Sequence, residues 1–101
     1  MTNKYLEIEC SNYKELCNKI IHFILQLDIT PYIKKLHPAT QDKLSKKRHP
    51  RITQAIFAEL MGVAEVTVRR WIYEGIPKIE RFIEIQQVFN ISFKISISPL
   101  N

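Results

Sequence analysis

A cluster of basic side chains near the middle of the chain is the first candidate for binding chemistry. Residues 31–51 carry seven Lys and Arg against one acid, so this stretch accounts for the whole net charge of +5. The cluster is densest at Lys46, Lys47, Arg48 and Arg51. Cationic groups at this density can neutralise the phosphates of a nucleic acid. Taken alone, such a run is more typical of a solvated surface, so the neighbouring sequence has to decide between the two interpretations.

Other side chains with reactive or metal-binding groups do not form a recognisable site. Cys10, Cys17, His22 and His37 are spaced too irregularly for a zinc signature, which needs ligand pairs about two to four residues apart. The chain has only two glycines, too few for a glycine-rich phosphate loop. No Ser/His/Asp set lies in a supporting local motif. We therefore expect a protein that is not an enzyme and that needs no metal or cofactor.

Length and composition indicate one packed domain, or one domain with a helical extension. The chain has 101 residues, of which 46% are hydrophobic and 25% charged, which is typical of a globular fold. Its apolar runs are far shorter than the roughly 20 residues that span a bilayer. No secretory signal opens the chain, and two cysteines do not make a disulfide framework. We expect a cytoplasmic location and no membrane partner.

The periodicity of the apolar residues predicts a mainly helical chain with a strand near each end. Alternation predicts strands at 4–10 and 91–98, and spacings of three and four predict a helix over 12–29. Ser11 or Asn12 can cap this helix, and Asn12 with Glu15 has the spacing of a capping box. Thr30 and Pro31 are predicted to cap and open a further helix. The remaining predicted helices cover 40–48, 54–61, 65–74 and 78–89.

Residues 54–73 are typical of two helices that cross at a wide angle through a tight turn. Ala58 provides the small side chain that such a crossing needs, and Gly62 occupies the first position of the turn. Gly75 then ends the second helix. The positions predicted to be buried are all large and apolar: Phe57, Met61, Val63, Val68 and Trp71. The positions predicted to face outward on the second helix are Ala64, Glu65, Val66, Thr67, Arg69, Arg70 and Tyr73.

This segment resembles the helix-turn-helix of the lambda-repressor-like family, the Cro and phage-repressor (XRE) type. The matching residues are Thr53-Gln54, Ala58, Gly62-Val63, Thr67-Val68 and Trp71. The likeness covers about 40 residues (52–92) and continues through Ile76-Pro77, Phe82, Ile83, Ile85, Val88-Phe89 and Asn90-Ile91-Ser92. The chain departs from the family pattern at Ala64, where a Ser or Thr cap is usual, and at Glu65 and Gln86.

The resemblance implies a mainly α fold with a helix-turn-helix DNA-binding domain over 39–92. Residues 1–38 would form an N-terminal strand-helix extension for dimerisation or partner binding, and residues 93–101 a C-terminal strand and tail. The implied function is sequence-specific binding of double-stranded DNA by a small transcriptional repressor or regulator. It would act as a homodimer on a palindromic operator, in the nucleoid of a bacterium or as a phage or mobile-element protein.

The second helix of the motif would enter the major groove, where guanidinium groups match the two acceptors of guanine. The implied DNA-binding residues on the motif are Gln54, Glu65, Val66, Thr67, Arg69, Arg70 and Tyr73. With this motif beside them, Lys46, Lys47, Arg48 and Arg51 are expected to bind the DNA backbone.

Two other functions and one further fold remain open from the sequence. The chain could be an antitoxin-like protein that binds a partner through its N-terminal helix and represses its own promoter, or an architectural or recombination-accessory DNA binder. Residues 54–73 could also be a helical hairpin with no nucleic-acid role. Because the 12–29 helix is apolar nearly all round, it must be covered either by its own domain or by a second subunit, and we expect a dimer built by the parts of the chain outside the motif. The two strands are expected to pair as a small antiparallel sheet, within one chain or across two.

Overall fold

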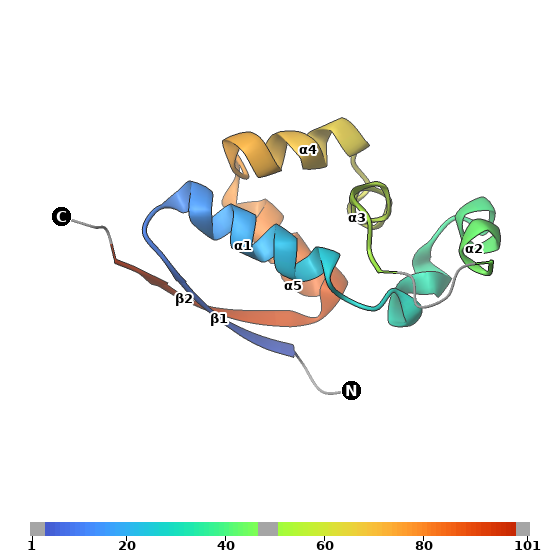
Figure 1. The fold of residues 1–101 in the computed structure, drawn as a ribbon, viewed down its shortest axis with the longest axis horizontal. Helices are drawn as coiled ribbons and strands as arrows, with labels where there is room; N and C mark the ends of the chain where they lie inside the picture. The colour runs from blue at the N-terminus through green and yellow to red at the C-terminus, as the bar shows by residue number, and fades with distance from the viewer. Residues whose placement is uncertain (1–3, 47–50, 99–101) are drawn as a thin grey trace.

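The computed structural model describes residues 4–46 and 51–98, and it is mainly helical with a two-stranded sheet (Figure 1). The elements follow in the order β1 (Lys4–Cys10), α1 (Tyr13–Leu25), a 3-10 helix η1 (Thr30–Lys35), α2 (Pro38–Leu44), α3 (Gln54–Met61), α4 (Glu65–Glu74), α5 (Ile79–Phe89) and β2 (Ile91–Ile97). The sheet lies on one side of the molecule and α4 on the opposite side, with α1 between them. This confirms the predicted helical fold with a strand near each end.

The two strands pair in parallel within one chain, so the predicted antiparallel sheet is wrong. Lys4 lies opposite Ile91 and Cys10 lies opposite Ile97. All five α-helices lie between the strands in sequence, and this long crossover brings β2 back in the direction of β1. The alternation of apolar residues specifies which face of a strand is buried, but it carries no information on strand direction.

α1 is shorter than predicted, and of its two predicted caps Asn12 is the one observed. The Asn12 side chain accepts a hydrogen bond from the Glu15 N–H at 2.9 Å, which satisfies one of the free donors of the first turn. The helix ends at Leu25 instead of residue 29. Beyond it the backbone turns toward residues 51–52, where the Leu27 carbonyl accepts from the Ile52 N–H at 3.2 Å. This long-range contact replaces the last predicted helical turn.

The apolar circumference of α1 is covered by its own chain. Cys17, Ile20, Ile21 and Ile24 have no exposed surface, because the sheet covers one side of the helix and α3 and α4 cover the other. Of the two covers that the sequence left open, its own domain and a second subunit, the first is the one observed, and the expectation that a dimer is needed to cover this helix is wrong. The N-terminal strand and helix contribute to the same core as α3, α4 and α5.

The segment between α1 and α3 begins differently from the prediction. Thr30 is the first residue of η1 and not its cap, and the Asp28 carboxylate accepts from the Thr30 N–H at 2.7 Å. α2 covers Pro38–Leu44 and not 40–48, because His37 caps it by accepting from the Ala39 N–H and Pro38 is suited to the first helical position. Lys46 follows the end of α2, and Lys47 and Arg48 lie outside the described residues.

An aromatic cluster at the centre of the core holds α3, α4 and α5 together. The Phe57 ring is fully buried, and its centroid lies 6.3 Å from that of Trp71 and 5.5 Å from that of Phe89. Tyr32 of η1 joins the cluster and donates its hydroxyl to the Phe89 carbonyl at 3.1 Å. The cluster fixes α4 relative to its neighbours, which matters for the surface that α4 presents.

Candidate nucleic-acid interface

The α3–turn–α4 segment has the local geometry that its sequence predicts. The Thr53 side chain accepts from the Ile56 N–H at 3.2 Å and begins α3. Gly62 ends α3 in the left-handed region with φ of +71°, and the next N–H, that of Val63, donates to the Ala58 carbonyl at 2.9 Å. Glycine is the residue that adopts this conformation without strain. The predicted turn at Gly62 is confirmed.

The inner face of α4 is anchored in the core as predicted. Val68 and Trp71 are buried, as are Phe57 and Met61 of α3. Val63 is the exception, since it is only half-buried in the turn. α1 also holds α4 from the side, because the Asn18 side-chain amide donates to the Ile72 carbonyl at 3.0 Å. α4 is therefore held rigidly along its length, as a helix that positions recognition side chains must be.

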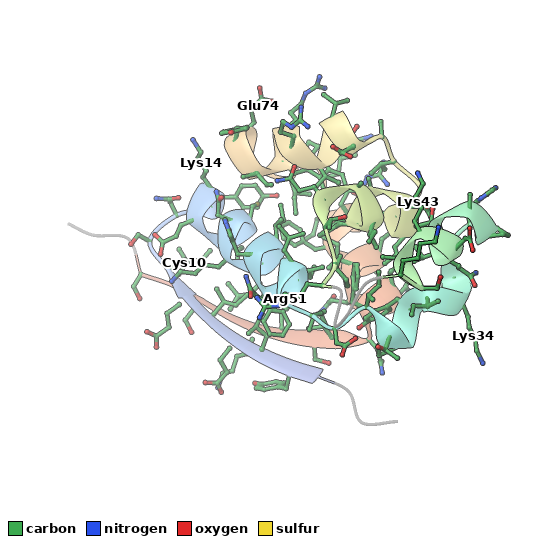
Figure 2. All side chains as sticks on the ribbon, turned by 45° about the vertical axis from the view of Figure 1, so that its right-hand side comes forward. Cys10, Lys14, Lys34, Lys43, Arg51 and Glu74 are labelled. Atoms are coloured by element: carbon green, nitrogen blue, oxygen red, sulfur yellow. The ribbon has the colours of Figure 1, made fainter. Side chains whose placement is uncertain are left out.

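The outer face of α4 carries the side chains that the sequence assigned to it. Thr67 is half-buried at the edge of this face, and Figure 2 shows the outer side chains projecting away from the body of the protein, around the labelled Glu74. The other residues predicted to face outward are all exposed: Ala64, Glu65, Val66, Arg69, Arg70 and Tyr73. We call the exposed residues Glu65 to Tyr73, with Thr67, the α4 outer face.

Arg69 and Arg70 have different surroundings. The Arg69 guanidinium is paired with the Glu65 carboxylate at 3.3 Å, with both side chains about half exposed to solvent. Arg70 has no acidic partner among the described residues. Within the described part of the chain, Arg70 is thus the unpaired cation of the α4 outer face. Arg69 must first break its ion pair with Glu65 before it can bind a phosphate or a base.

A second group of cations, which the sequence reasoning missed, lies beside the carboxyl end of α4. A groove of about 310 Å³ is lined by Thr67, Arg70, Glu74, Lys78 and Arg81, among others. The Arg81 guanidinium is placed 5.7 Å over the Trp71 ring and is paired with Glu84 at 3.0 Å. The signal in the sequence was the position of Lys78 directly after Pro77, where α5 begins.

The basic residues before α3 form a separate group. Lys43 and Arg51 line a groove of about 380 Å³ next to Thr53 at the start of α3, and both are labelled in Figure 2. The Arg51 guanidinium also donates to the Gln26 side-chain carbonyl at 2.8 Å. Gln54, the first residue of α3, is half-buried, and Lys46 is exposed. The structure thus places Arg51 beside Thr53, the residue that caps α3, and Lys43 is a further cation that the sequence reasoning did not single out.

The ionisable groups with perturbed pKa values lie away from the α4 outer face and have structural roles. Hydrogen bonds from Thr40 and His37 lower the pKa of Glu59, which ties α2 to α3: the Thr40 hydroxyl donates to this carboxylate at 2.7 Å. Burial raises the pKa of Tyr32. Within residues 4–46 and 51–98, no three His, Cys, Asp or Glu side chains gather closely enough to hold a metal ion.

No helix in the described part of the chain is both long and apolar enough to cross a bilayer. Comparison of the chain with protein-family models, with curated proteins and with solved structures found no match.

Proposed function

We propose that this chain is a sequence-specific double-stranded DNA-binding protein with a lambda-repressor-like helix-turn-helix, acting as a small transcriptional repressor or regulator. The observation that carries the proposal is the α4 outer face. It presents two arginines beside acidic, apolar and hydroxyl-bearing side chains, on a helix whose opposite face is fixed in the core by Val68 and Trp71. A helix presented in this way fits the major groove, which is about 12 Å wide.

Each part of the surface has a role in this proposal. Arg70 is free to form the two hydrogen bonds that guanine offers in the major groove, and Val66 can contact a thymine methyl group. Glu65 can accept from the amino group of cytosine. Gln54 at the start of α3 and Lys78 beside the carboxyl end of α4 would bind the flanking phosphates, and Arg81 could join them on breaking its pair with Glu84.

The same proposal includes a homodimer on a palindromic operator. One helix of this size contacts few base pairs, so two copies related by a two-fold axis would be needed to read a site of useful length. Partner binding through the N-terminal helix, the basis of the antitoxin alternative, has less support because Ile20 and Ile24 of α1 are fully buried.

Selection of bound sequences from a random pool of double-stranded DNA tests the proposal. A sequence-specific dimer is expected to enrich a motif with an inverted repeat, whose half-sites are about one helical turn (34 Å) apart. An architectural DNA binder would enrich no defined motif, and a protein with no nucleic-acid role would retain no DNA. Double substitution of Arg69 and Arg70 by Ala provides the control, because it should abolish enrichment while the fold remains intact.

A further inference from the structure

An apolar surface remains open between α5 and β2, on the side of the sheet that faces the helices. Four isoleucines there are strongly exposed, namely Ile79 (72%), Ile83 (50%), Ile95 (42%) and Ile97 (51%). Ile79, Ile83 and Ile95 also line a groove of about 360 Å³, which Leu16, Phe82 and Phe93 help to form. We call this the α5–β2 groove. Contiguous exposed apolar side chains of this size usually mark a surface that another molecule covers.

The two strands of the sheet are covered unequally. Ile8 of β1 is 4% exposed, whereas Ile95, which lies opposite it on β2 and on the same face, is 42% exposed. The next pair on that face, at the carboxyl end of both strands, shows the same difference, since Cys10 is 6% exposed and Ile97 is 51% exposed. The helices therefore cover β1 and leave the second half of β2 open, so the missing cover belongs beside β2.

The outer edge of β2 has free backbone groups next to this groove. The Ser98 N–H donates to the Cys10 carbonyl at 3.0 Å, so the even-numbered residues of this segment direct their backbone groups toward β1. Because these groups alternate along a strand, those of Phe93, Ile95 and Ile97 point to the free edge. The sheet has two strands only among the described residues, and no described strand pairs with this edge.

The charges on the two strands indicate that the free edge of β2 is better suited than that of β1 to pair with a further strand. β1 carries Glu7 and Glu9 on its outward-facing side, and charged side chains of this kind discourage edge-to-edge pairing. The outward-facing residues of β2 are Ser92, Lys94 and Ser96, so Lys94 is the single charge along β2. An edge with one charge and an apolar inner face is complementary to a copy of itself, as a two-fold interface requires.

We propose that a second copy of this chain occupies the α5–β2 groove, with its β2 paired antiparallel to this β2 in one four-stranded sheet. Ile95 would then lie opposite the partner's Ile95, and Phe93 opposite the partner's Ile97. The backbone groups of these residues already point to the free edge, so each pair can exchange two hydrogen bonds. The Ile79 and Ile83 faces of the two α5 helices would approach each other above the new strand pair.

Lys94 fixes the centre of this pairing. A two-fold axis at Lys94 would place like charges directly opposite each other, which destabilises a strand pair. With the axis at Ile95, Lys94 lies opposite the partner's Ser96 instead, and both apolar faces stay on the same side of the sheet. An axis at Phe93 would pair equally many residues of β2 and would also keep the two lysines apart, but it would leave the exposed Ile97 outside the pairing. The axis at Ile95 separates the lysines and includes both exposed isoleucines of β2.

A second copy fits the proposed function better than an unrelated strand, because it would orient the α4 helices of both copies in the same way. The two-fold axis of an antiparallel strand pair is perpendicular to the sheet, so the helices of both copies lie on the same side of it. α4 lies on the side of the molecule away from the sheet (Figure 1), and both α4 outer faces would point in one direction. This strand pair would be the homodimer interface of the proposed function, and it would form whether or not DNA is bound.

Light scattering on DNA-free protein at tens of micromolar tests the proposal. The expected mass is twice the 11.9 kDa of one chain. Ile83→Glu places a charge in the groove, and Ile95→Pro removes an N–H that points to the free edge without removing a hydrogen bond to β1. Each change should raise the dimer dissociation constant at least about tenfold. Ile95→Ala keeps the N–H and should weaken the dimer less than Ile95→Pro.

Val66→Glu is the matched control, because Val66 is 54% exposed but lies on α4, so this variant should keep the mass of two chains. Circular dichroism identifies variants that remain folded, and Ile79→Lys replaces any variant that does not. The proposal is overturned if the unaltered protein has the mass of one chain or forms a mixture of larger species. It is also overturned if the folded groove variants keep the mass of two chains. Binding of single half-sites by the monomeric variants then tests DNA recognition separately.

Discussion

The carboxylate of Glu65 lies 3.3 Å from the guanidinium of Arg69, one turn further along the exposed side of α4. In an exposed position this pair contributes at most about 1 kcal/mol to folding, so its main effect concerns what Arg69 can bind. Glu65 places a negative charge on the surface that we propose to face DNA, and the pair neutralises one of the two arginines there. It also holds Arg69 in one orientation.

Replacing Glu65 by Gln is therefore expected to increase affinity for DNA of any sequence. The change removes the repulsion between Glu65 and the phosphates and leaves Arg69 without an acidic partner. The slope of log affinity against log salt should therefore become steeper by about one. Preference at one base pair should relax at the same time, if Glu65 accepts from a cytosine. Fluorescence anisotropy over a range of salt concentrations measures both effects, and unchanged affinity and slope would place Glu65 outside the interface.

Arg70→Ala and Arg69→Ala are each expected to cost about 1–3 kcal/mol on the selected DNA site and to relax preference at one position. The effect should be larger for Arg70, because this guanidinium has no ion pair among the described residues that would have to break before it binds DNA. Competition binding against single-base variants of the site measures both quantities. Loss of affinity that is equal on all sequences would make these arginines phosphate contacts.

Neutralising Lys46, Lys47 and Arg48 together is expected to weaken specific and non-specific DNA binding alike. Each lost phosphate contact should reduce the slope of log affinity against log salt by about one. The matched comparison is Lys43→Gln, which alters the groove at the start of α3 without touching this cluster. If the slope stays the same in the triple variant, the cluster is a solvated surface.

Substitution of the two glycines by Ala should destabilise the fold to different extents. Gly62 has φ of +71° and open space where a Cβ would be built, so only the left-handed backbone opposes Ala, at about 1 kcal/mol. Gly75 has φ of +91° with ψ of 163°, a region that is essentially restricted to glycine, and the cost should be about 2–3 kcal/mol. Urea unfolding compares the two, and Gly62→Asn should be milder than Gly62→Ala because Asn tolerates this conformation. Equal costs for the two Ala variants would contradict this ordering.

Tyr32→Phe should reduce the free energy of unfolding by about 1 kcal/mol at neutral pH, since it leaves the buried Phe89 carbonyl without its hydroxyl donor. Burial raises the pKa of Tyr32 above its usual 10.0. The stability that depends on the neutral phenol is complete below pH 10 and is lost as the pH rises through the folded pKa. The advantage of the unaltered protein over Tyr32→Phe is therefore expected to shrink above pH 10 in urea titrations. A difference that stays constant to pH 11 would show that the pKa of Tyr32 is the same in the folded and unfolded states.

The local features of this fold could be predicted from the sequence, and its long-range features could not. Several features depend only on residues within a few positions of each other. They are the cap of α3 at Thr53, the turn at Gly62 and the burial of Trp71. The early end of α1 depends on a contact between Leu27 and Ile52, and no glycine or proline near residue 25 signals it. The parallel direction of the strands likewise follows from the path of all the helices between them.

The same distinction applies to the candidate interface. The outward positions of α4 follow from its helical period, so the exposed side chains from Glu65 to Tyr73 were predicted correctly. The grouping of Arg70 with Lys78 and Arg81 depends on how α5 turns back beside α4, which no local pattern contains. The Glu65–Arg69 ion pair has the four-residue spacing of helical ion pairs, so the sequence contained a signal for it that went unused.

The pairing of Lys4 with Ile91 has a consequence for how the protein is made. β1 and α1 leave the ribosome early, but the strand that completes their sheet is synthesised only after α5. Until then the edge of β1 that pairs with β2 lacks its neighbour, and closing so long a loop is a slow step of folding. α4 is therefore synthesised before the core that fixes it is complete. The nascent chain exposes the apolar surface of α1 in this interval, so we expect chaperones to contact it there, and DNA binding to begin only once translation has passed β2.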